Sequence, residues 1–124
     1  MFRSKAALRS EDARRIARHV LVYERAEALL DDVLLVVSEL VSNAVRHAGG
    51  VTGFRVRRDA GAIVVEVADG SPRRPRSPDA PAHAPGGFGW MLVNRLAERT
   101  EVHSRPDGKT IAAFLALPAP AAAT

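Results

Sequence analysis

Three polar side chains recur at intervals of four residues: Glu39, Asn43 and His47. Four residues advance an α-helix by about 400°, so a helix would carry all three within roughly 80° of arc on one face. A carboxylate can act as a general base, and an Asn side-chain oxygen is a hard ligand suited to Mg²⁺. A His one turn further on can orient or neutralise phosphate. An ordinary solvated helix face fits the same spacing, and the spacing alone slightly favours that interpretation.

Two other segments carry residue types that suit an anionic ligand. Asp69-Gly70 directly follows a strand-like segment, so its carboxylate can sit at the bottom of a pocket and accept a hydrogen bond from an amino group. Gly86-Gly87-Phe88-Gly89 precedes a helical pattern, and glycines at a helix N-terminus let backbone N–H groups approach a phosphate. Each segment also has a plain alternative, namely a strand-to-loop Asp and a flexible loop end.

The elements that must position these residues are visible in the apolar periodicity. The period predicts helices over residues 10–22, 30–48 and 87–99, and strands over 54–57, 63–68, 101–104 and 110–117. Ser10 is the expected N-cap of the first helix, and Gly49-Gly50 ends the second. The residues of the third helix expected to face inward are Met91, Leu92, Leu96 and Ala97. Hairpin connections predict a mostly antiparallel sheet with helices packed on one face, which is a two-layer α/β sandwich of the α+β class.

Length and composition narrow the class of protein. A chain of 124 residues suits one domain, expected over residues 1–117, with a disordered Pro/Ala tail over 118–124. There are no cysteines, and no apolar run approaches the ~20 residues of a membrane span, so we expect no disulfide, no membrane contact and a cytoplasmic protein. The net charge of +4 invites an anionic partner, but aromatic residues make up only 5%, which argues against nucleic-acid binding.

Taken in order, four motifs resemble those of the GHKL superfamily of ATPases, over about residues 10–117. The run from Glu39 to Ala48 resembles the N box, and Val67-Ala68-Asp69-Gly70-Ser71-Pro72 resembles a shortened first glycine box. Gly87-Phe88-Gly89 resembles the second glycine box, and Gly108-Lys109-Thr110 lies where a Thr joins the adenine pocket. The resemblance implies the Bergerat fold and a site for ATP and Mg²⁺.

The resemblance also implies roles for individual residues. Asn43 would coordinate Mg²⁺, with His47 beside the phosphates. Asp69, followed by Gly70, would bind the adenine amine with support from the Thr110 hydroxyl. Gly87 and Gly89 would close over the phosphates, and Glu39 would be the general base. Residues 69–87 would form a lid over the nucleotide, in which Arg73, Arg74 and Arg76 either reach phosphate or partner or are simply solvated.

The subgroup that the chain resembles most is that of the anti-sigma-factor serine/threonine kinases. That resemblance implies a protein kinase whose partners are a sigma factor and an antagonist protein, in a homodimer if the short N-terminal segment suffices. Two departures stand out: Ser71-Pro72 replaces the later glycine of the first glycine box, and Trp90 follows Gly89 where a small aliphatic residue is usual. The alternative function is a non-catalytic protein-interaction module, with or without nucleotide.

Overall fold

The structure is a computed structural model, and it describes residues 8–73 and 87–119. Most of the expected lid, including Arg74, Arg76 and Gly86, lies outside the described residues, as do residues 120–124 of the expected tail. In the described ranges, no helix is both long and apolar enough to span a bilayer.

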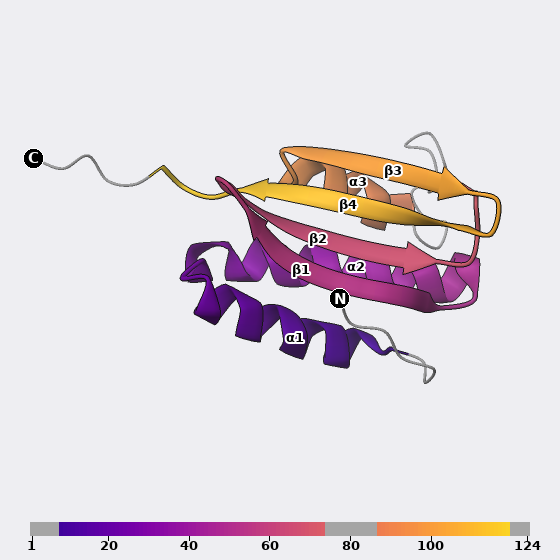
Figure 1. The fold of residues 1–124 in the computed structure, drawn as a ribbon, viewed down its shortest axis with the longest axis horizontal. Coiled ribbons are helices and arrows are strands. Elements are labelled where there is room, and N and C mark those ends of the chain that lie inside the picture. The colour runs from indigo at the N-terminus through magenta and orange to yellow at the C-terminus, as the bar shows by residue number, and fades with distance from the viewer. Residues whose placement is uncertain (1–7, 74–86, 120–124) are drawn as a thin grey trace, which may run out of the picture.

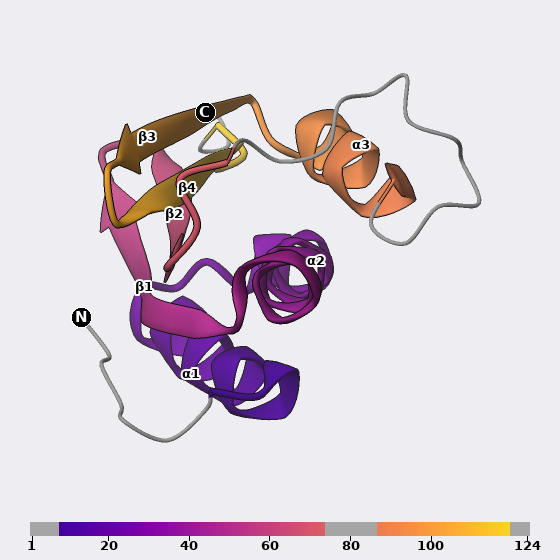
Figure 2. The ribbon, with the colours of Figure 1, turned by 90° about the vertical axis from the view of Figure 1, so that its right-hand side faces the viewer.

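Helices and strands form two layers, with the helices against one face of a single sheet (Figures 1 and 2). The elements are α1 (Ser10–Tyr23), the 3-10 turn η1 (Glu27–Leu29), α2 (Leu30–Ala48), β1 (Val51–Asp59), β2 (Ala62–Asp69), α3 (Gly87–Leu96), β3 (Arg99–Arg105) and β4 (Gly108–Ala116). The strand order is β1-β2-β4-β3, and each neighbouring pair is antiparallel. The predicted α+β two-layer sandwich is confirmed.

Helix α2 is the centre of the helical layer because its apolar side chains recur at intervals of three and four. The buried members are Val33, Val36, Val37, Leu40, Val41 and Ala44. The helix ends at Gly49, whose φ of 75° is left-handed, and the Gly50 N–H donates to the carbonyl oxygen of Ala44 at 2.9 Å. Glycine is favoured in that conformation because it has no Cβ. The predicted end of the helix is therefore confirmed.

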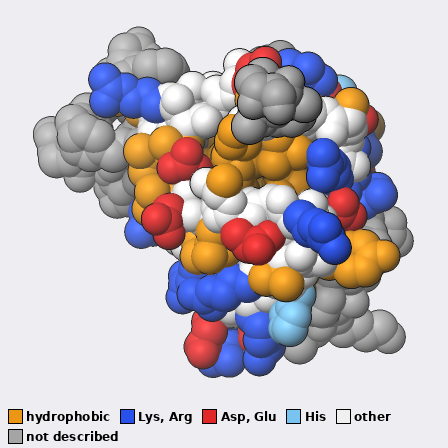
Figure 3. All heavy atoms as spheres, turned by 90° about the vertical axis from the view of Figure 1, so that its left-hand side faces the viewer, with side chains coloured by type: hydrophobic (Ala, Val, Ile, Leu, Met, Phe, Trp, Pro, Cys, Tyr) orange, Lys and Arg blue, Asp and Glu red, His pale blue; other side chains and the backbone are white. Residues whose placement is uncertain are grey.

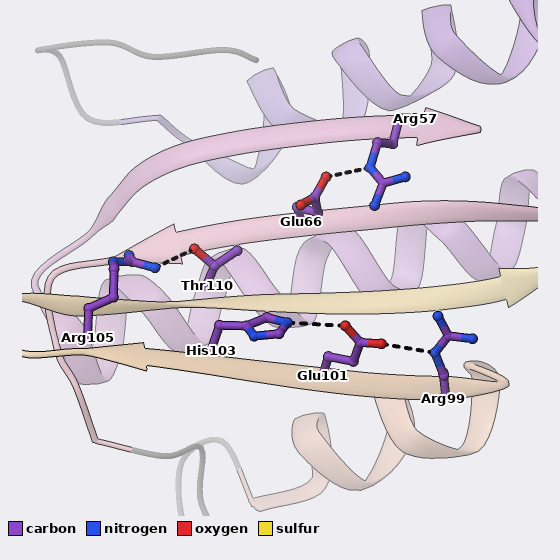
Figure 4. Close-up of polar contacts among 7 residues, drawn as sticks. All are labelled: Arg57, Glu66, Arg99, Glu101, His103, Arg105 and Thr110. Atoms are coloured by element: carbon purple, nitrogen blue, oxygen red, sulfur yellow. Dashed lines mark hydrogen bonds and ion pairs between the residues drawn. The ribbon is translucent and has the colours of Figure 1, made fainter. Parts of the chain in front are cut away.

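The two faces of the sheet differ because side chains alternate along each strand. The face toward the helices carries core residues of β1, β2 and β4, and the half-buried Val102 of β3 packs against them. The core residues include Phe54, Ile63, Val65, Val67, Ile111, Ala113 and Leu115. The open face carries a small apolar cluster of Val64, Ala112 and Phe114. Charged side chains of β1, β2 and β3 lie on the same face (Figure 4). Arg99 covers Phe114, with its guanidinium 3.8 Å from the ring centroid.

Details of α1 and α3 differ from the sequence prediction. Ser10 is the first helical residue of α1 rather than its N-cap, which is Arg9; the Asp12 carboxylate accepts a hydrogen bond from the Arg9 N–H at 3.3 Å. Helix α3 ends at Leu96 instead of running to 99, because the Glu98 N–H donates to Phe114 of β4 at 2.7 Å and draws the chain into the sheet.

The prediction that Met91 faces inward is also wrong. Its side chain is 37% exposed, whereas Val93 is fully buried.

Candidate functional site

Four element ends meet on one side of the molecule, at the right of Figure 1 and facing the viewer in Figure 2. Helix α2 and strand β2 finish there, and helix α3 and strand β4 begin there. We call this the site end. It gathers most of the residues that the sequence singled out.

Glu39 lies at the junction of α2 and α3, where its side chain is half-buried. Its carboxylate packs directly against Gly89, in the first turn of α3, so closely that a Cβ on residue 89 would collide with Glu39 Oε2. The N–H groups of a helix's first turn attract negative charge. The first turn of α3 therefore accommodates an oxyanion, and the absence of a side chain at residue 89 makes room for it.

Asn43 lies one turn after Glu39 on α2. Its Oδ1 atom is buried and has no hydrogen-bond partner in the part of the chain that the structure describes. Leaving a buried polar atom unpaired costs about 1–3 kcal/mol. Such an atom in a native fold points to a strain reservoir, a functional role or an unseen ion or water.

Asp69 ends β2 as a buried carboxylate that is already paired with neighbouring groups. The ammonium of Lys109 lies 3.0 Å from each of its two oxygens, and the Ser71 N–H donates to Oδ1 at 2.9 Å. The side chains of Asp69 and Lys109 are only 3% and 7% exposed. The predicted adenine-binding carboxylate therefore carries a cation that the sequence analysis did not anticipate.

Lys109 was missed, although the sequence holds a signal for it. It stands two residues before Ile111 on β4, so the strand period places its side chain on the core face with Ile111 and Ala113. The antiparallel register then sets it directly opposite Asp69. A lysine whose side chain lies on the core face of a strand needs a buried counter-charge.

Gly108 stands next to this pair and is constrained by backbone. A Cβ at residue 108 would collide with the carbonyl oxygen of Asp69. By contrast, no atom of the described residues lies within 4 Å of the position that a Cβ on residue 70 would take, so their packing does not require glycine there.

Two predicted site residues, Thr110 and His47, are not part of the buried contacts described above. The Thr110 side chain is on the open face of the sheet, where its hydroxyl accepts a hydrogen bond from Arg105 at 3.0 Å (Figure 4). Asp69 and Lys109 are on the other face, so the structure does not bring Thr110 together with Asp69. His47 is exposed in the last turn of α2.

The site end thus holds two clusters. One joins Glu39 and Gly89, with Asn43 a turn further along α2 and Gly87 as the first residue of α3. The other joins Asp69, Ser71 and Lys109, with Gly108 beside them.

A family described as the histidine kinase-like ATPase domain matches residues 2–114. No curated protein matches the chain significantly.

Proposed function

The chain belongs to the histidine kinase-like ATPase domain family, part of the GHKL superfamily, and from that premise we propose that it binds Mg-ATP at the site end and acts as a serine/threonine protein kinase. The substrate would be an antagonist protein, and a sigma factor or similar regulator would be the protein it sequesters. The family match supports nucleotide binding. The kinase step and the partners are the finer part of the proposal.

The observation that carries the proposal is the buried Oδ1 of Asn43, which has no hydrogen-bond partner within residues 8–73 and 87–119. Mg²⁺ prefers oxygen ligands and commonly takes only one or two from the protein, because phosphate oxygens and water supply the others. A metal-bound nucleotide would give this oxygen the partner that it lacks among the described residues. Asn43 would thus hold Mg²⁺, and its chemistry fits the group that the family implies.

Gly89 and the first turn of α3 support the phosphate part of the site. Residue 89 carries no side chain, which leaves the Glu39 carboxylate packed against it and would let an oxyanion approach the first turn of α3. A bound triphosphate would be attracted by the same N–H groups. The nucleotide, when bound, supplies the phosphoryl group that is transferred.

Glu39 would be the general base. Its carboxylate would take the proton from a Ser or Thr hydroxyl as that oxygen bonds to the transferred phosphorus and the bond to the leaving diphosphate breaks. Its position supports this role, because it lies against the turn where the phosphates are expected.

Binding is tested with Asn43→Ala. Titration calorimetry with Mg-ATP should show binding to the parent chain and a loss of at least about tenfold in affinity for the variant, since one metal ligand is removed. Val45→Ala is the matched control, because Val45 is exposed on the same helix. Equal affinity in Asn43→Ala and the parent would remove Asn43 from the site, and no binding by the folded parent would end the nucleotide proposal.

Catalysis is tested separately with Glu39→Gln. Proteins captured by the parent chain with Mg-ATP would be incubated with labelled ATP and each variant. We expect Glu39→Gln to bind Mg-ATP as the parent does and to transfer phosphate at least about a hundredfold more slowly, as loss of a general base does. Equal transfer rates would refute the assignment of the base.

A second candidate function, partner docking without catalysis, is favoured by a groove between α1 and β1. It has a volume of about 730 Å³ and is lined by His19, Val20, Val22, Tyr23, Glu24, Arg55, Val56, Arg57 and Arg58. The end of the molecule opposite the site end has hydrophobic side chains interspersed with basic and acidic ones (Figure 3). Tyr23 is 85% exposed, and exposed aromatic and arginine side chains are typical of protein interfaces.

Tyr23→Ala tests this second candidate. If the groove receives the partner, the variant should lose capture of that protein while its affinity for Mg-ATP stays unchanged. Leu35→Ala, an exposed apolar position on α2, is the control for loss of surface apolar area. Unchanged capture by Tyr23→Ala would exclude the groove as the docking surface.

A further inference from the structure

We propose that Lys109 sets the base preference of the nucleotide site: by holding Asp69, it makes the site tolerant of guanine as well as adenine. This inference rests on the proposed nucleotide binding, and it concerns which nucleoside triphosphates are accepted. The phosphates and Mg²⁺, rather than the base, would then supply most of the affinity.

The first step is the state of the Lys109 ammonium. It donates to Asp69 at 3.0 Å and to the carbonyl oxygen of Ser71 at 3.1 Å, and its nitrogen is also 3.0 Å from the second Asp69 oxygen. An ammonium has three N–H donors, and three oxygens surround this one. The cation is therefore fully engaged by the end of β2 and the residues that follow it.

The second step is the number of hydrogen-bond acceptor positions that remain free on the Asp69 carboxylate. Oδ1 accepts from both Lys109 and the Ser71 N–H, and Oδ2 faces Lys109. A carboxylate has about four acceptor positions, so only about one is left. The charge is also neutralised, and a hydrogen bond between ionised groups is roughly twice as strong as a neutral one. The amino group of adenine would have to compete with an ammonium for this acceptor.

The third step concerns discrimination between purines. Adenine presents an amino group where guanine presents a carbonyl oxygen. A free carboxylate accepts from the amino group and repels the carbonyl, and a site built on such a contact rejects the wrong analogue strongly. The Lys109 ammonium weakens both effects, because it occupies acceptor positions of the carboxylate and neutralises the charge that would repel a carbonyl oxygen. The ion pair therefore distinguishes the two bases less than a free carboxylate would.

The pair is fixed by the fold rather than formed by loose surface side chains. The register of β2 and β4 sets Asp69 opposite Lys109, and Gly108 brings the β4 backbone against the Asp69 carbonyl. Both side chains are buried. The cation is therefore present at the carboxylate before any ligand arrives.

The test compares the affinities of Mg-ATP and Mg-GTP by competition against a fluorescent nucleotide, in the parent chain and in Lys109→Met. The Met side chain keeps the apolar stem and removes the charge. We expect the parent to prefer ATP by less than about tenfold, and Lys109→Met to raise that preference at least about tenfold, as a freed acceptor should. Arg105→Met is the matched control, since it removes one cation from the opposite face of the sheet.

If Lys109→Met does not fold, Lys109→Gln is used in its place. The Gln amide keeps an N–H that can donate to the buried Asp69 carboxylate. This variant should shift the preference in the same direction. A parent preference for ATP above about tenfold, or a preference that no folded Lys109 variant changes, would overturn the inference and leave nucleotide binding standing. Absence of binding by every nucleotide to the folded parent and variants would overturn the proposed function and this inference with it.

Discussion

Asp69 at the site end is buried, and Asn43 is half-buried with a buried Oδ1 atom; the two differ in what surrounds their oxygens. Asp69 has a counter-ion and a backbone donor, whereas the oxygen of Asn43 has no partner among the described residues. Buried polar groups gain stability only when they are paired. At the residue scale, Asp69 contributes to the fold, and Asn43 weakens it in a way that a ligand would reverse.

Asn43→Leu tests that contrast. An apolar side chain of similar size removes the unpaired oxygen, so the free energy of unfolding should rise by about 1 kcal/mol, while Mg-dependent nucleotide binding should be lost. Denaturant unfolding of both proteins without nucleotide measures the first effect. A lower stability of Asn43→Leu would mean that the oxygen is already paired in the free protein.

The Asp69–Lys109 pair predicts strong coupling between two single substitutions. Asp69→Asn leaves a buried ammonium without a counter-charge and should lower the free energy of unfolding by about 3–5 kcal/mol. Asp69→Asn combined with Lys109→Met removes both charges and should recover most of that loss. The double-mutant cycle in denaturant measures the coupling, and additive losses would contradict a buried ion pair.

At the scale of elements, Gly89 packs against a side chain that can move, and Gly108 packs against strand backbone that cannot. At residue 89, a Cβ would meet the end of the flexible Glu39 side chain, and at residue 108 it would meet the backbone of β2. A side chain can turn away, but a strand paired on both edges cannot shift without breaking its ladder. Glycine at residue 108 is therefore required by the packing of β4 on β2, whereas glycine at residue 89 makes room for the Glu39 carboxylate.

Alanine substitution at each glycine tests this difference, because only the change at residue 108 should lower stability substantially. Gly108→Ala should lower the free energy of unfolding by about 1–3 kcal/mol, as overpacking does. Gly89→Ala should leave stability within about 1 kcal/mol of the parent, since better helix propensity offsets the displaced Glu39. Thermal and denaturant unfolding give both values, and equal losses at the two glycines would contradict the packing argument.

Strand β3 carries a charge ladder on the open face of the sheet (Figure 4). The Glu101 carboxylate lies 3.1 Å from a ring nitrogen of His103 and accepts from Arg99 at 3.1 Å. These two hydrogen bonds, that of His103 first, lower the pKa of Glu101 below its ordinary value of 4.5. Because the pKa is lower in the folded state, the contacts stabilise the fold above about pH 4.5, and this contribution is lost as the pH falls through the folded-state pKa.

Glu101→Gln should therefore melt about 1–3 °C below the parent near pH 6, and the difference should shrink on acidification below about pH 4.5. Melting temperatures of both proteins across that range provide the measurement. Glu98→Gln, which changes the charge at another exposed position, is the control. A difference that stays constant or grows in acid would contradict the ladder.

For the whole molecule, the features that could be predicted from the sequence are those that the local spacing of apolar residues determines. The apolar spacing of α2 and its glycine end gave the correct helix, and the alternation along the strands gave both hairpins. The end of α3 was misplaced because a hydrogen bond from Glu98 to a distant strand determines it. Periodicity within one segment carries no information about such a contact.

The candidate site shows the same division. Glu39 and Gly89 meet as their motifs suggest, but the face of Thr110 and the partner of Asp69 depend on how β2 and β4 pair. A shift of one residue in that register reverses every side chain on the strand. The motif directs attention to Thr110, whereas the register brings Lys109 to the carboxylate.

The strand order has a consequence for the chain as it is being made. Strand β4 pairs with both β2 and β3 but follows them in the sequence. Lys109 is therefore synthesised 40 residues after Asp69. At ribosomal speeds of about 5–20 residues per second, β2 stays without its inner neighbour for about 2–8 s. During that interval, Ile63, Val65 and Val67 lie along an open edge that chaperones or other nascent chains can bind. Arrival of β4 closes that edge and assembles the Asp69–Lys109 cluster in the same event.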